Sequence, residues 1–160
     1  MSRRNPERSQ LSTTLTIAEL SSRVGQEVGI SPWLTIDQQR VDDYARVIND
    51  PQWIHVDVER AKTGPFGGTI AHGFLTLALL SHLIEQTFAF GDRKMGINYG
   101  LNRVRFTAPL PVGSRIRAHF MLGSWERTDD TIQTVWNVTV EREGGEKPVL
   151  VAEWVTRSHV

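Results

Sequence analysis

The sequence contains no cysteine, which excludes disulfides, zinc–thiolate sites and cysteine nucleophiles. It also lacks an excess of charge, because 18 Lys and Arg residues balance 18 Asp and Glu residues. No basic run extends beyond Arg3-Arg4, which argues against a nucleic-acid-binding module. A hydrophobic content of 39% and a charged content of 22% are typical of a globular protein rather than of a disordered chain.

Long hydrophobic runs are absent as well. The most apolar stretch, residues 74–84, is shorter than the roughly 20 residues that span a bilayer, and Ser81 and His82 interrupt it. The amino terminus carries positive charges, but no apolar segment follows them as in a signal peptide. We therefore expect a soluble, cytoplasmic protein with no membrane partner.

The length of 160 residues fits one domain with a tail. Residues 1–14 are polar and rich in Ser, Thr and Arg, and we expect them to form a flexible tail before a single domain over residues 15–160. Apolar spacing, capping residues and strand alternation predict the elements. They are helices over residues 17–24, 38–49, 58–62 and 70–90, an edge strand over 31–36, and strands over 98–107, 114–124, 131–142 and 149–157.

The segment 70–90 is apolar nearly all round, which is typical of a buried helix. The four strands that follow it must cover this helix, so the pattern predicts an α+β fold in which one antiparallel sheet wraps one helix. A single sheet covers only one side of the helix. We therefore expect a second copy of the chain on the other side, in a homodimer.

The segment Asn49-Asp-Pro-Gln-Trp-Ile-His55 places a carboxylate and an imidazole five residues apart, in a turn broken by Pro51. A turn can direct both side chains at one point, where Asp50 and His55 would hold a water molecule and move its proton. The spacing alone also fits a simpler interpretation, in which Asp50 caps the turn and His55 bonds to the backbone.

A second segment, Gly67-Gly-Thr-Ile-Ala-His-Gly-Phe74, places Gly73 at or near the start of the buried helix. Helix amino termini present unpaired N–H groups, and glycine lets a ligand carbonyl approach them closely, as an oxyanion hole requires. The alternative is a glycine chosen for helix packing, with His72 a hydrogen-bonded core histidine.

These segments resemble the MaoC-like dehydratase family, which includes (R)-specific enoyl-CoA hydratases and the nodulation protein N group. The resemblance rests on Asp50-Pro-Gln-Trp-Ile-His55, Ala61, and Ile70-Ala-His-Gly-Phe-Leu75, and extends over about residues 20–157. It also includes Asn102-Arg-Val-Arg-Phe106 and Pro111-Val-Gly113. The family motif Gly-Asp-x-Asn-Pro-aliphatic-His keeps its Asp-to-His spacing here, whereas Asn49, Gln52 and Trp53 fill its Gly, Asn and Pro positions. The sequence of the segment from Asp50 to His55 is most similar to that of the nodulation-protein-N branch.

The resemblance implies a hot-dog fold and an enzyme that adds water reversibly to trans-2-enoyl thioesters, giving (R)-3-hydroxyacyl thioesters. Asp50 and His55 would form the catalytic pair, and the Gly73 amide would supply the oxyanion hole. Ser81 matches a serine that some members place near the active site. No metal or separate cofactor is implied, because coenzyme A or phosphopantetheine arrives as part of the acyl-CoA or acyl-carrier-protein substrate.

Several residues are candidates for binding this substrate. An apolar tunnel for the acyl chain could be lined by Trp53, Phe66, Phe74 and Leu77. Each of these residues also fits a purely structural role in the hydrophobic core. Arg103, Arg105, Arg115 and Arg117 are candidates for phosphate contacts, although a basic sheet face is usually only solvated. The full set of predicted substrate-binding residues is Gln52, Trp53, Phe66, His72, Phe74, Ser81, Arg103 and Arg105.

Three other functions remain open at the level of sequence. A hot-dog thioesterase would release free thiol from acyl-CoA. The dehydratase of fatty-acid synthesis would use the same site in the reverse direction on carrier-protein substrates. A non-catalytic subunit that binds acyl thioesters is the third alternative, and the replacements at Asn49, Gln52 and Trp53 keep it open.

Overall fold

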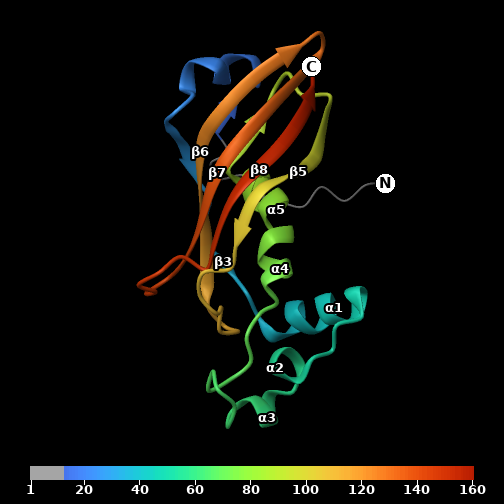
Figure 1. Cartoon of the computed structure of the whole chain (residues 1–160), viewed down its shortest axis with the longest axis vertical. Coiled ribbons are helices and arrows are strands. Elements are labelled where there is room, and N and C mark those ends of the chain that lie inside the picture. The colour runs from blue at the N-terminus through green and yellow to red at the C-terminus, as the bar shows by residue number, and fades with distance from the viewer. Residues whose placement is uncertain (1–12) are drawn as a thin grey trace, which may run out of the picture.

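An antiparallel sheet curves around one helical segment in the computed structural model, which describes residues 13–160 (Figure 1). The strands run in the order β2-β6-β7-β8-β5, and β3 pairs with β6 beside β2. Their bounds are β2 Glu27–Ile30, β3 Leu34–Thr35, β5 Met95–Arg105, β6 Arg115–Thr128, β7 Thr131–Arg142 and β8 Leu150–His159. The helical segment consists of α4 (Gly73–Ala78) and α5 (Leu80–Thr87). This arrangement confirms the predicted α+β class and all four of the long predicted strands.

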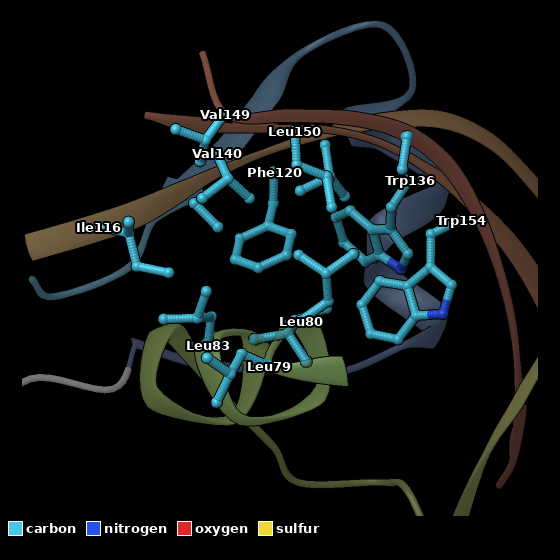
Figure 2. Close-up of a cluster of buried hydrophobic side chains, with 14 of the residues drawn as sticks. Leu79, Leu80, Leu83, Ile116, Phe120, Trp136, Val140, Val149, Leu150 and Trp154 are labelled. Carbon is cyan, nitrogen blue, oxygen red and sulfur yellow. The ribbon is translucent and has the colours of Figure 1, made fainter. Parts of the chain in front are cut away.

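The alternation of side chains along the strands decides which face of the sheet meets the helix. On β6 the buried positions are Ile116, Ala118, Phe120 and Leu122, which are the apolar positions of the sequence pattern. Figure 2 shows Leu80 and Leu83 of α5 facing Phe120 and Trp136 of the sheet. The helix and the sheet therefore enclose one hydrophobic core.

The central helix is shorter than predicted and consists of two parts. Its first turn begins at Gly73 rather than at residue 70, because Ile70 forms a β-bridge with Pro111 and its N–H donates to the carbonyl of Ile54. The two parts meet at Leu79, whose backbone remains right-handed helical. At the other end, residues 88–90 are extended and form β4 (Phe88–Phe90). An apolar sequence suits either conformation, and the available strand partners decide between them.

The first described strand, β1 (Thr13–Leu15), pairs in parallel with β4. The prediction of a tail is therefore wrong for Thr13 and Thr14, and its remainder, residues 1–12, lies outside the described residues. The first predicted helix is present as a 3-10 helix, η2 (Ala18–Arg23), whose Leu20 is buried. Within residues 13–160, no helix is long and apolar enough to cross a membrane.

Three helices lie beyond one end of the sheet, next to the start of α4 (Figure 1). They are α1 (Gln38–Ile48), α2 (Trp53–Val56) and α3 (Val58–Ala61). Both predicted capping carboxylates are confirmed: Asp37 accepts from the N–H of Arg40 at 2.8 Å, and Asp57 accepts from the N–H of Arg60 at 3.0 Å. Asp50 and His55 lie within this helical end of the molecule.

Candidate active site

The turn that carries Asp50 begins where α1 ends. Asn49 adopts a left-handed conformation, with φ 56° and ψ 40°, and the N–H of Asp50 donates to the carbonyl of Ala45 at 3.0 Å. Glycine and asparagine are the residues that adopt this conformation most readily. This explains how asparagine can fill the glycine position of the family motif.

His55 is held on α2 by bonds to three of its groups, and its side chain is only 7% exposed. Its Nδ1 lies 2.6 Å from the carbonyl oxygen of Ile70, which can only accept, so Nδ1 carries the proton. The backbone carbonyl of His55 accepts from Nε2 of Gln38 at 2.8 Å, and its N–H donates to the carbonyl of Gln52. These contacts leave Nε2 of the His55 ring with a free lone pair, as a general base requires.

Asp50, His55 and His72 converge at one place. A carboxylate oxygen of Asp50 and one ring nitrogen of each histidine all lie within 4.8 Å of one another. The two imidazole rings are stacked, with centroids 3.7 Å apart and an angle of 23° between their planes. One water molecule at hydrogen-bonding distance, about 2.8 Å from each partner, can bridge Asp50 and His55 across such a gap.

The same three residues have the composition of a metal site, but the rings are poorly arranged for one. A metal ion lies close to the plane of each imidazole that binds it, at about 2.1 Å from the nitrogen. Stacked rings 3.7 Å apart do not offer such a shared point. In addition, Nδ1 of His55 donates to Ile70, and Nε2 of His72 faces the carbonyl oxygen of Asp50 at 3.0 Å. The arrangement fits proton transfer better than metal binding.

The surroundings of His55 favour its neutral form. Burial lowers the pKa of His55 below its ordinary value of 6.5, and the neighbouring His72 lowers it further, whereas the Ile70 carbonyl and Asp50 oppose the shift. Tyr44 contacts the edge of the His72 ring, with centroids 5.2 Å apart. Burial and the nearby Asp50 raise the pKa of Tyr44, so its phenol stays protonated.

His55 and Gly73 open onto one cavity of about 310 Å³. Phe66, Thr76 and Phe106 are among its other lining residues. Gly73 is the first residue of α4, so its N–H has no acceptor within the helix. A Cβ built on Gly73 would lie 2.8 Å from the ring of Phe106, so any side chain there would force the ring or the backbone to shift. The imidazole-bearing residue His55 and the first residue of α4 therefore line the same cavity.

The other predicted substrate-binding residues are more scattered. Phe66 lines the cavity, but Phe74 is 64% exposed and packs against Phe106 from outside it. Gln52 is exposed at the start of α2, and Trp53 lies beneath the guanidinium of Arg60, 4.3 Å from it. Neither residue lines the cavity that holds His55 and Gly73.

Ser81 and Leu77 lie farther along the helical segment. Ser81 accepts a hydrogen bond from Nδ2 of Asn98 at 3.0 Å and lines a different cavity of about 230 Å³, together with Trp136 and Trp154. Leu77 is half-buried and packs against the hydrophobic core. The structure thus separates Ser81 from the residues around His55.

The four arginines fall into two classes. Arg115 forms an ion pair with Glu143, and Arg117 forms one with Glu141. Both also lie over the ring of Trp33. The candidate phosphate contact of this pair stays a prediction. Arg103 and Arg105 are exposed on β5, and among residues 13–160 neither forms an ion pair.

Two residues that support the site were not predicted. Gln38 bonds to the backbone of His55, and its Oε1 accepts from the hydroxyl of Thr69 at 2.6 Å. Gln38 directly follows the capping residue Asp37, in a position that carries no recognisable signal in the sequence. These contacts join segments 17 and 31 residues apart, which local patterns do not reveal.

Comparison with known proteins gives the same family as the sequence motifs. The model of the MaoC-like domain matches residues 19–144. The 3-hydroxyacyl-thioester dehydratase Z of Mycobacterium tuberculosis is 50% identical over 143 residues, covering 89% of this chain and 95% of the relative. Nodulation protein N of Rhizobium leguminosarum bv. viciae is 47% identical over 145 residues, covering 89% of this chain and 90% of the relative.

Among solved structures, the R-hydratase PhaJ1 of Pseudomonas aeruginosa is similar with a TM-score of 0.68 and 26% identity. The match covers 88% of this chain and 83% of that one. This structural similarity confirms the expected hot-dog fold, in which a curved antiparallel sheet wraps one helical segment. The chain belongs to the MaoC-like domain family.

Proposed function

We propose that the protein is a hydro-lyase that adds water reversibly to trans-2-enoyl thioesters and forms (R)-3-hydroxyacyl thioesters. The observation that carries this proposal is the approach of the Asp50 carboxylate to the His55 ring, within 4.8 Å, where His55 shares a cavity with the Gly73 amide. The dehydratase name of the relative that is 50% identical supports the same reaction.

The reaction uses each of these three groups. Nε2 of His55 takes a proton from the water held between it and Asp50, while the water oxygen bonds to the β-carbon. The electrons of the double bond move toward the thioester, whose oxygen becomes negative. The N–H of Gly73 donates to this oxygen, a contact typically worth about 3 kcal/mol in the transition state. The protonated member of the pair then delivers a proton to the α-carbon, which completes the addition.

The substrate is a thioester of coenzyme A or of acyl carrier protein, and no metal or separate cofactor takes part in the proposed reaction. Phe66 and Phe106 supply apolar surface for the acyl part within the cavity. Arg103 and Arg105 are exposed and carry no ion pair among the described residues, so we assign the phosphate contacts to these two rather than to Arg115 and Arg117.

The working form in this proposal is a homodimer that pairs along β5. This strand is at the end of the sheet and pairs only with β8 among the described strands. Its large apolar side chains are 40% to 56% exposed: Met95, Ile97, Tyr99 and Leu101. Phe106, which lines the cavity, follows β5 directly. A second copy on this edge would therefore lie beside the proposed active site.

Hydration of crotonyl-CoA and of longer enoyl-CoAs, followed by loss of the enoyl absorbance, tests the proposed activity. Asp50→Asn should lower kcat by at least about 100-fold, since it removes one member of the acid–base pair. Its side chain is 51% exposed, so the variant should remain folded. Asp43→Asn, an exposed carboxylate change on α1, is the matched control.

Three outcomes would contradict the proposal. Hydration that continues in Asp50→Asn at the rate of the control would refute the catalytic pair. Release of free thiol without loss of the enoyl absorbance would identify a thioesterase. Binding of every enoyl-CoA without turnover would identify a non-catalytic subunit.

A further inference from the structure

His72 contacts every group of the proposed active site, although it does not line the cavity. Its ring is stacked on His55 at 3.7 Å, and its Nε2 lies 3.0 Å from the backbone oxygen of Asp50 and 3.8 Å from the carboxylate. Through the chain it is bonded to Gly73. The side chain is only 3% exposed, which leaves no room for substrate to touch it.

One atom of this buried ring has no hydrogen-bond partner among residues 13–160. Nε2 faces two oxygens of Asp50, neither of which can donate when the carboxylate is ionised, so Nε2 carries the proton. Nδ1 is then a bare acceptor, and no donor in the part of the chain that the structure describes reaches it. An unpartnered buried polar atom costs folding free energy and calls for an explanation other than stability. A phenylalanine of similar shape would fill the same space without this cost.

We propose that His72 is a positioning residue that holds the Asp50 carboxylate, the His55 ring and the Gly73 amide in one arrangement. This inference rests on the proposed hydro-lyase activity. The His72 ring limits the rotation of the His55 ring by stacking. The Nε2–H group fixes the backbone of Asp50 at the turn, just before Pro51. The backbone of His72 itself sets the place of the Gly73 amide.

Two substitutions separate the contributions of the ring and of the hydrogen bond. His72→Phe keeps a flat ring against His55 but removes the donor to Asp50. His72→Gln keeps an N–H donor at a similar reach but removes the ring. The matched controls are His82→Phe and His82→Gln, since His82 is exposed on α5 and outside the site. Each variant is compared for kcat, KM, the pH profile of kcat/KM and the midpoint of urea unfolding.

We expect kcat of His72→Phe to fall about 100-fold, which is the effect of displacing catalytic groups by about 1 Å. KM should change much less, because His72 does not touch substrate. His72→Gln should recover part of this loss, to within about tenfold of the wild type. The urea midpoint of His72→Phe should not fall, because the unpartnered Nδ1 is gone. The His82 variants should match the wild type in all four measurements.

The pH profile distinguishes positioning from a structural role. The titratable groups packed against the His72 ring are the Asp50 carboxylate, the His55 imidazole and the Tyr44 phenol. Since the His72 ring stacks on His55 and contacts Asp50, either substitution changes the surroundings of the His55 imidazole and should shift the acid limb of kcat/KM. A role confined to stability would leave this limb in place.

Unchanged kcat in His72→Phe, or a loss that matches its unfolded fraction with the acid limb unmoved, would overturn the inference. If His72→Phe does not fold, kcat and the acid limb of the pH profile are compared between His72→Gln and the wild type instead. The same outcomes in His72→Gln would overturn the inference. A wild type that turns over no enoyl thioester would instead refute the proposed function. In that case, an NMR titration of His55 decides the role of His72. If His55 has the same tautomer and the same pKa in the wild type and in the folded His72 variant, the positioning role of His72 is refuted.

Discussion

The ionisation of His55 should determine how the activity depends on pH. Burial is the main cause that lowers the pKa of His55 below 6.5. We therefore expect the acid limb of kcat/KM, where the free base is lost, to have its midpoint below 6.5. A pH profile of the wild type measures this, and an acid limb with a midpoint at or above 6.5 would contradict it.

The same shift has a consequence for stability. Between the ordinary pKa of 6.5 and the lower value in the folded protein, the unfolded chain binds a proton at His55 and the folded chain does not. The free energy of unfolding should therefore fall as the pH drops through this window, and the contribution of His55 should level off below it.

At the residue scale, local sequence predicted the convergence of Asp50 and His55 because they lie only five residues apart, across the bend between α1 and α2. The turn itself depends on Asn49, whose left-handed backbone explains the departure from the family motif. The stacking of His72 on His55 could not be predicted in the same way. These rings come from segments 17 residues apart and meet only because Ile70, which anchors His55, lies two residues before His72.

At the scale of elements, the contact between the start of α4 and the segment after β5 shapes the cavity. Gly73→Ala would place a methyl group 2.8 Å from the Phe106 ring, so either the ring or the amide must move. We expect hydration to fall about 100-fold, since the amide no longer donates along the required direction. The measurement is kcat for crotonyl-CoA hydration.

Gly68→Ala is the control for this change, because a Cβ at Gly68 meets nothing within 4 Å. This variant should keep the activity of the wild type. Gly73→Ala with full activity would show that the Gly73 amide does not stabilise the thioester oxygen.

Prediction of elements succeeded where local signals were sufficient. The capping carboxylates Asp37 and Asp57 and the alternating strands lie where the sequence places them. It failed at residues 70–72 and 88–90, at the two ends of the central helix. There, apolar residues pair with Pro111 and with β1, and such long-range pairing overrides helical periodicity.

At the scale of the whole molecule, the proposed homodimer can be tested through the exposed edge of β5. Leu101→Lys places a charge among the exposed apolar residues of this strand, which should oppose association. We expect the variant to be monomeric by light scattering and to lose most of its activity, because the cavity lies beside this edge. Met121→Lys is the control, since Met121 is 43% exposed on β6, away from the edge.

A dimeric Leu101→Lys variant would show that the copies do not associate through this strand. A monomeric variant with full activity would show that one chain forms a complete active site.

The free edge of β5 also has a consequence for the production of the protein. A strand with one row of unpaired backbone amides and carbonyls offers a template to any other extended chain. Newly synthesised chains that have folded but found no partner are thus exposed to aggregation. Slow expression at low temperature, or a lysine at this edge, should raise the yield of soluble protein. Inclusion bodies should increase when chains are synthesised faster than they can associate.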